Sequence, residues 1–335
     1  MFIRDCRWPI ALAMTLILIF IALLIYFNLP ISKKSLNEVS SWCYQLQGKK
    51  DTLLKIEALE QLSCDLLVTD YSATGEEKNE WTRSDIKRLK VNGRIVLSYL
   101  SIGEAESVRF YFRTLDKKLI HAENQDWKGN FKVYFWQAEW QETIFHYIDR
   151  IINQGFDGVY LDIIDAYFYF GLKENGGLGI RREAAQDMIE FVDKIARHAR
   201  FTRNKKDFLV FVQNASAITQ AESFPKGLSL EGQKLMQTSV PPRTVLKNRY
   251  FNSINAIGVE DVFFRGREKN NNPYNPDPFV LKYLEEFKKH GKPIFSIEYI
   301  QDEILINQYF KVAQEKGFIP LAVERSLDGS FLRSE

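Results

Sequence analysis

The sequence predicts a (β/α)₈ barrel that follows one N-terminal transmembrane helix. Strand-like and helix-like runs alternate over about three hundred residues of the chain, which indicates βα units around a parallel sheet. Glycine residues stand where helix-like runs end and strand-like runs begin. No glycine-rich phosphate loop follows the first strand-like run, so the pattern favours a closed barrel over a doubly wound open sheet.

The first element is an apolar run from Ile10 to Phe27 that contains no charged residue. About 20 helical residues cross a bilayer core of roughly 30 Å, so this run predicts a transmembrane helix. A cleaved signal peptide is the alternative, but residues 28–32 offer no small-x-small cleavage site. We therefore expect a tail at 1–9, an uncleaved anchor at 10–29, a linker at 30–40 and the barrel domain at 41–335.

Eight strand-like runs follow the linker, each rich in β-branched or aromatic residues and bounded by polar residues or glycine. In chain order they are Trp42–Leu46, Asp65–Asp70, Arg94–Leu100, Gly158–Asp162, Phe208–Gln213, Ile254–Glu260, Pro293–Tyr299 and Phe318–Val323. Eight parallel strands, each followed by a helix, are typical of a (β/α)₈ barrel.

Helix-like runs, with apolar residues three and four positions apart, lie between these strands. They cover Thr82–Val91, Glu139–Gln154, Arg182–Arg200, Pro278–His290 and Glu303–Lys316. Gly93, Gly155, Gly291 and Gly317 each follow one of these runs. A glycine in the left-handed conformation ends a helix without steric strain, so we expect the helices to end there.

Two segments do not fit the repeat. Asn130–Trp136 is strand-like but would make a ninth strand, so we assign it to a long loop between the third strand and its helix, over the barrel mouth. Lys226–Tyr250 contains two consecutive prolines and little periodicity. We expect it to form an excursion on the same side, before the sixth strand.

Composition excludes several classes of function. The chain carries 45 Lys+Arg and 43 Asp+Glu, a formal charge of +2 without a basic block, which argues against a nucleic-acid partner. The four histidines lack metal-ligand spacing, so we expect no structural zinc. No Ser/His/Asp spacing supports a serine nucleophile. We expect Cys43 and Cys64 to be free thiols rather than a disulfide.

Acidic residues follow most of the predicted strands. Asp70 ends the second strand, Glu104 follows the third, Asp162 and Asp165 follow the fourth, and Glu260 ends the sixth. The carboxyl ends of barrel strands meet at one rim, where the loops build the pocket. One such residue is more often a helix cap, but several carboxylates in one pocket suit glycoside hydrolysis, which needs an acid and a nucleophile or base.

Aromatic residues are expected near the same rim. They are Tyr44, Tyr71, Tyr99, Tyr134, Trp136, Tyr167 and Tyr299. Aromatic faces stack on sugar rings, although each residue alone is as often part of a core. The aromatic residues therefore fit a sugar-binding pocket but do not establish one.

Five motifs make the chain similar to a known family. They are LVTDYS (67–72), YLSIGEAE (99–106), GFDGVYLDIIDAY (155–167), QNA (213–215) and GVED (258–261). With these motifs in this order, the chain after residue 40 resembles glycoside hydrolases of the endo-α-1,4-polygalactosaminidase type, glycoside hydrolase family 114. The resemblance implies a TIM-barrel fold and cleavage of α-1,4-linked galactosamine-containing exopolysaccharides.

The resemblance also implies roles for residues. Asp162 and Glu260 match the family's catalytic carboxylates. Our own hypothesis divides the roles, with Asp162 as nucleophile or base and Glu260 as acid. We expect the substrate to be bound by Asp70, Tyr71, Tyr99, Glu104, Trp136, Asp165, Asn214 and Tyr299. The segment at 226–252 is longer and more basic than the family pattern, so the match of Glu260 rests on fewer neighbouring residues than that of Asp162.

The leading hypothesis is an exported, membrane-anchored glycosidase whose barrel lies outside the cytoplasm, in the periplasm or outside the cell. Its expected partners are an amino-sugar polysaccharide and, through the N-terminal helix, the membrane. No cofactor and no metal are expected. Two alternatives remain open: a non-catalytic polysaccharide-binding barrel of the cell envelope, and a metal-assisted hydrolase.

Overall fold

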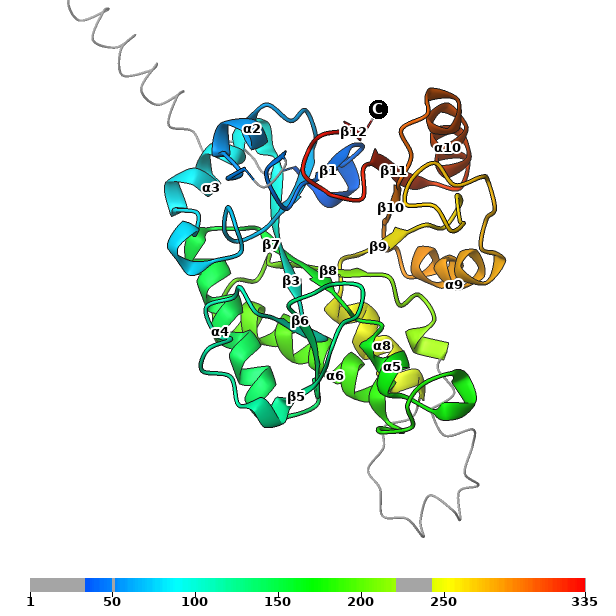
Figure 1. The fold of residues 1–335 in the computed structure, drawn as a ribbon. Helices are drawn as coiled ribbons and strands as arrows, with labels where there is room; N and C mark the ends of the chain where they lie inside the picture. The colour runs from blue at the N-terminus through cyan, green and yellow to red at the C-terminus, as the bar shows by residue number, and fades with distance from the viewer. Residues whose placement is uncertain (1–33, 50–51, 221–242, 335) are drawn as a thin grey trace, which may run out of the picture.

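The computed structural model describes residues 34–49, 52–220 and 243–334, which form an α/β barrel-like fold (Figure 1). Eight parallel strands follow one another round the sheet, and a ninth pairs antiparallel with the last of them. The parallel strands are β1 (Trp42–Tyr44), β2 (Leu66–Thr69), β3 (Ile95–Ser101), β7 (Gly158–Asp162), β8 (Leu209–Gln213), β9 (Ala256–Glu260), β10 (Ile294–Glu298) and β11 (Phe318–Val323). All eight predicted barrel strands are thus confirmed.

The sheet is nearly closed, because single hydrogen bonds join its first and last parallel strands. The Trp42 indole in β1 donates to the Ile319 carbonyl in β11 at 3.1 Å. Beyond the strand ends, the Leu46 amide donates to the Leu327 carbonyl at 3.0 Å. The antiparallel strand β12 (Leu332–Arg333) follows β11 in place of an eighth helix.

Helices cover the outside of the sheet (Figure 1). They are α2 (Ile56–Glu60), α3 (Arg83–Leu89), α4 (Ala138–Gln154), α5 (Ala166–Phe170), α6 (Ala184–Arg197), α8 (Arg243–Ser253), α9 (Pro278–Lys289) and α10 (Glu303–Glu315). Thr82, Asp277 and Asp302 cap three of them by accepting hydrogen bonds from first-turn amides. The four predicted glycines are all left-handed, with φ between 65° and 94°, which confirms where these helices end.

The two irregular segments differ in outcome. Asn130–Val133 is strand β6, but it lies outside the barrel, as expected, in a small antiparallel sheet between β4 (Glu104–Glu106) and β5 (Ile120–Glu123). The excursion expected at 226–250 is wrong at its end, because 243–250 belong to helix α8. Leu246 and Tyr250 are buried one turn apart, and α8 packs on α6, so tertiary contacts stabilise a helix that has few apolar positions.

The core has two layers. Inside the barrel, aromatic side chains dominate, with Trp42, Tyr44, Tyr160, Phe211 and Phe295 in ring-to-ring contact. A larger aliphatic and aromatic layer fills the space between the sheet and the helices.

Two further expectations concern cysteines and the membrane. Cys43 and Cys64 are both free thiols, as expected. Within the described residues, no helix is both long and apolar enough to cross a bilayer. The anchor predicted at 10–29, like Cys6, lies outside the described residues, as do the tail and residues 30–33 of the predicted linker.

Candidate active site

A cleft of about 630 Å³ opens at the carboxyl ends of the barrel strands. Residues from all eight parallel strands, or from the loops that follow them, line it. Six of the lining residues are acidic, namely Asp70, Glu104, Glu106, Asp162, Asp165 and Glu260, against two arginines, Arg109 and Arg325. The cleft therefore concentrates negative charge, although the chain as a whole is almost neutral.

Asp162 is the last residue of β7 and is held on both carboxylate oxygens. Its Oδ2 accepts the Tyr99 hydroxyl at 2.8 Å, and its Oδ1 accepts the Ile163 amide at 2.7 Å. Burial and then the negative charge of Glu260 raise the pKa of Asp162 from 3.8 to about 8. At neutral pH this carboxyl group holds a proton.

Glu260 is the last residue of β9 and is fixed by its neighbours. Its carboxylate accepts the Asn214 side-chain amide at 3.1 Å and the Tyr299 hydroxyl. The Asn214 side-chain oxygen in turn accepts the Glu260 backbone amide at 3.1 Å, so side chain and backbone are locked together. Asp162 and Glu260, nearly one hundred residues apart in the sequence, thus share one cleft, where the charge of Glu260 raises the pKa of Asp162.

Three residues of the site wall have unusual backbone conformations. Ile163, Asn214 and Asp261 each follow directly on a barrel strand and have φ values of 58°, 59° and 50°. Asparagine and aspartate tolerate the left-handed conformation, whereas it is strained for β-branched isoleucine, and strained residues of this kind are typical of functional sites.

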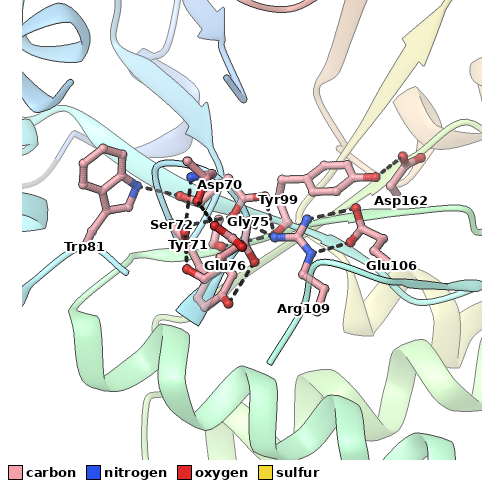
Figure 2. A network of polar contacts seen from close by, with 12 residues as sticks. Asp70, Tyr71, Ser72, Gly75, Glu76, Trp81, Tyr99, Glu106, Arg109 and Asp162 are labelled. Atoms are coloured by element: carbon pink, nitrogen blue, oxygen red, sulfur yellow. Dashed lines mark hydrogen bonds and ion pairs between the residues drawn. The ribbon is translucent and has the colours of Figure 1, made fainter. Parts of the chain in front are cut away.

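A buried ion-pair network forms the second wall of the cleft (Figure 2). Arg109 lies between Asp70, at 2.7 Å, and Glu106, which it binds through two nitrogens at 2.7 and 3.0 Å. Burial raises the pKa of Asp70 to about 6; the charge of Arg109 opposes this shift, whereas Glu106 adds to it. Arg109 therefore holds two carboxylates that would otherwise repel each other.

Glu104 has an oxygen without a partner. Its Oε1 accepts Lys132 Nζ at 2.8 Å and the Asn124 amide at 2.9 Å, while its buried Oε2 has no hydrogen bond to any described residue. Nearby, Asp165 precedes α5 but makes no side-chain cap, and its side chain is open to the cleft. Loss of solvent around its carboxylate raises the pKa of Asp165. The positive charge of Lys132 opposes this shift, and the negative charges of Glu260 and Glu104 add to it.

Most of the predicted site residues come together in this cleft. Asp70, Tyr99, Glu104, Asp162, Asp165, Asn214, Glu260 and Tyr299 all line it. Tyr71 and Trp136 do not. Tyr71 is fully buried on the other face of its segment, where its hydroxyl donates to the Gly75 carbonyl, because neighbours along an extended chain point to opposite sides. Trp136 packs on Phe170 and beneath Arg181 instead.

Several residues that line the cleft were not among the predicted site residues. Arg109, Glu106, Gln213 and Arg325 line the cleft, and Arg325 stacks on Tyr299 at 3.7 Å while pairing with Asp261. Glu106 lies in the YLSIGEAE motif and Gln213 in the QNA motif, so the sequence already contained a signal for these two residues. Arg109 lies in an irregular loop without periodicity, and nothing local marks it as buried. No group of three His, Cys, Asp or Glu in the described part of the chain is arranged to bind a metal ion.

Comparisons with known sequences identify the family. The model of glycoside-hydrolase family GH114 matches residues 29–334. An uncharacterized protein of Methanocaldococcus jannaschii is 30% identical over 311 residues, which are 89% of this chain and 80% of that protein. An uncharacterized protein of Thermotoga maritima is 30% identical over 299 residues, 86% of this chain and 81% of its own length.

Solved structures share the fold. The glycoside hydrolase domain of PelA from Pseudomonas aeruginosa has a TM-score of 0.60 and 15% identity, covering 88% of this chain and 98% of that domain. Ega3 from Aspergillus fumigatus, solved in complex with galactosamine, has a TM-score of 0.61 and 17% identity, covering 92% and 100%. At these identities the likeness concerns the barrel-like fold.

Proposed function

Because the chain belongs to glycoside hydrolase family GH114 and is therefore a glycosidase, we propose that it cuts an α-1,4-linked galactosamine-type exopolysaccharide internally. Asp162 and Glu260 are the catalytic carboxylates of this proposal. The observation that carries it is their common position in one acidic cleft, with a pKa of Asp162 that is raised by burial and by Glu260. Glycosidases require such a pair, one group protonated and the other ionised.

The chemistry needs one proton on the pair. One carboxyl group donates it to the departing glycosidic oxygen, while the other attacks the anomeric carbon or removes a proton from water. The hypothesis drawn from the sequence has Glu260 as the acid. The raised pKa of Asp162 favours the opposite division of roles in the substrate-free cleft. Tyr99, Tyr299 and Asn214 hold the two carboxylates in place by hydrogen bonds in either case.

The acidic cleft supports an amino-sugar substrate. A galactosamine polymer is cationic, and six carboxylates against two arginines attract such a chain. The open carboxylate of Asp165 offers an acceptor for ammonium or hydroxyl groups. Ega3, the structural relative solved with galactosamine, supports the same choice of sugar.

The proposal includes the location of the enzyme. The apolar run at 10–27 acts as an uncleaved anchor, and the (β/α)₈ barrel works outside the cytoplasm, where an exopolysaccharide is accessible. Supporting this, the run is long enough to cross a bilayer and lacks a cleavage site.

Substitution of each carboxylate tests the catalytic assignment. The full chain, purified in detergent, is incubated with galactosamine polymers, and new reducing ends and product masses are measured. Asp162→Asn and Glu260→Gln should each lower the rate by at least about 10³-fold. If either variant keeps the full rate, the carboxylate that it replaces is not catalytic. Depletion of polymer from solution without new reducing ends indicates a binding barrel instead.

A folding control belongs to the same experiment. A pKa of Asp162 above its ordinary value means that its ionisation disfavours the folded state as pH rises from about 4 through 8. Asp162→Asn is therefore expected to melt no lower than wild type at pH 8. Chemical rescue then separates the roles: azide restores a variant that lacks the nucleophile, and a nitrophenyl leaving group restores one that lacks the acid.

A further inference from the structure

Two adjoining pockets open at the other end of the barrel, where the strands begin. Their volumes are about 600 and 460 Å³. Residues that directly precede β7 and β8 line the first, and the first residues of β3 and β8 line the second. Both pockets include Lys206, Asp207 and Phe208, so they form one continuous surface, here called the basal groove.

The basal groove carries cations that no described residue neutralises. Lys90 is paired with Asp157 at 3.0 Å, and Arg200 is bonded to Asn255 and the Phe208 carbonyl. By contrast, Arg83, Lys205 and Lys206 make no side-chain hydrogen bond or ion pair with any described residue. They lie around a solvent-filled pocket that also contains Asp207, which leaves an excess of positive charge. Three unpaired cations at one pocket suit a phosphate-bearing ligand.

An exposed aromatic residue adjoins these lysines. Phe201 lies in the short π-helix η7 (His198–Thr202), four residues before Lys205, and 75% of its surface is exposed. Phe201 has no burial role that would account for a phenyl ring there. An aromatic side chain next to basic residues is typical of segments that bind a membrane surface, where the ring enters the interface and the lysines contact anionic headgroups.

The chain enters the barrel at the same end. Lys34 lines the basal groove, and its backbone amide donates to the Gly93 carbonyl at 3.1 Å, at the turn before β3. Only residues 28–33 separate Lys34 from the apolar run that ends at Phe27. Six residues reach at most about 20 Å. If that run lies in a bilayer, the basal groove is held within a short distance of the lipid headgroups.

We propose that the basal groove and Phe201 dock on an anionic phospholipid surface, with Arg83, Lys205 and Lys206 contacting headgroup phosphates. The catalytic cleft, at the opposite end of the strands, then faces away from the membrane toward the polysaccharide. This inference goes beyond the proposed function, because it concerns a second binding surface and the orientation of the barrel. It involves no residue of the cleft.

Lysine footprinting of the full chain tests the docking. The protein is reconstituted into nanodiscs of phosphatidylcholine alone or with about 30% phosphatidylglycerol, and acetylation rates are read by mass spectrometry. Lys205 and Lys206 should react about fivefold more slowly in the anionic discs, with the difference lost in high salt. Lys128, exposed beside the cleft, is the control and should not change. Equal rates in both discs, or equal slowing of Lys128, overturn the proposal.

Two further measurements separate membrane docking from the binding of free phosphate. Phe201→Ala should restore fast acetylation of Lys205 and Lys206, whereas Phe279→Ala, which removes a ring that is 70% exposed at the opposite end of the barrel, should not. Protection by about 10 mM inorganic phosphate in zwitterionic discs would identify a free-phosphate site and overturn the membrane assignment. None of these readouts depends on hydrolysis, so failure of the docking leaves the catalytic proposal standing.

Discussion

The protonation of Asp162 determines how the enzyme should respond to pH. Its pKa is raised to about 8, so the pair keeps its proton at neutral pH and loses it above that value. We expect kcat/KM on a galactosamine polymer to fall on the basic side with a midpoint near pH 8.

A variant of Tyr99 tests the origin of that midpoint. The Tyr99 hydroxyl donates to Asp162 and stabilises the ionised carboxylate, which lowers the pKa of Asp162. Tyr99→Phe should therefore move the basic limb of kcat/KM to higher pH. A limb that stays in place, or moves down, contradicts the assignment of this limb to Asp162.

Arg109 is the residue on which the stability of the cleft wall should depend most. Its side chain is 3% exposed and compensates two buried carboxylates, Asp70 and Glu106. Arg109→Ala leaves both without a cation, which destabilises the fold by about 3–5 kcal/mol. Arg88→Ala, which removes a partly exposed arginine from two glutamates, is the matched control and should have a much smaller effect. Urea unfolding measures both; similar losses would contradict the role of burial.

At the scale of elements, the barrel interior is so tightly filled that one strand requires glycine. A Cβ added at Gly258 in β9 would meet the Tyr160 hydroxyl at 1.7 Å and its ring at 2.6 Å. The Tyr160 hydroxyl itself is buried without a partner among the described residues. Gly258→Ala should therefore destabilise the fold by about 1–3 kcal/mol through overpacking.

Coupling between the two positions distinguishes overpacking from a general effect on the strand. Tyr160→Phe removes the hydroxyl and should cost little by itself. In the double variant, Tyr160→Phe should recover part of the stability that Gly258→Ala loses, because the clash with the hydroxyl is gone. The recovery is only partial because the ring still lies close to the new methyl group. Thermal melts of the four proteins complete the cycle. Simple additivity of the two changes would show that the Tyr160 hydroxyl is not the obstacle.

Elements with a strong local signal were predictable, and those that depend on distant contacts were not. Gly155 marked the end of α4 because only a left-handed residue fits there, and Asp162 was expected at the rim because the strand before it is a clear apolar run. Helix α8 was missed because its burial against α6 supplies what its own apolar pattern lacks. Arg109 was missed for the same reason, since its ion-pair partners lie at the end of a strand thirty-nine residues earlier and at the end of the short strand β4, and the sequence does not show that these meet.

At the scale of the whole molecule, charge is separated although the net charge is only +2. Acidic residues gather at the cleft, and basic residues that pair with no described residue gather at the basal groove. This polarity matters for association, because a cleft that carries one sign of charge raises the local concentration of an oppositely charged polymer. The same field would also turn the basal groove toward an anionic membrane.

The acidic cleft therefore predicts a strong salt dependence for a cationic substrate. Raising NaCl from about 0.02 to 0.5 M should increase KM for a galactosamine polymer severalfold and leave kcat nearly unchanged, since salt screens the approach and not the chemistry. The fully N-acetylated polymer carries no charge and should show little change. Asp165→Asn, at the open side of the cleft, should reduce the salt effect on the cationic polymer, whereas Glu315→Gln, exposed at the end of α10, should not. If salt acts equally on both polymers, the carboxylates of the cleft serve catalysis and folding but do not select an amino sugar.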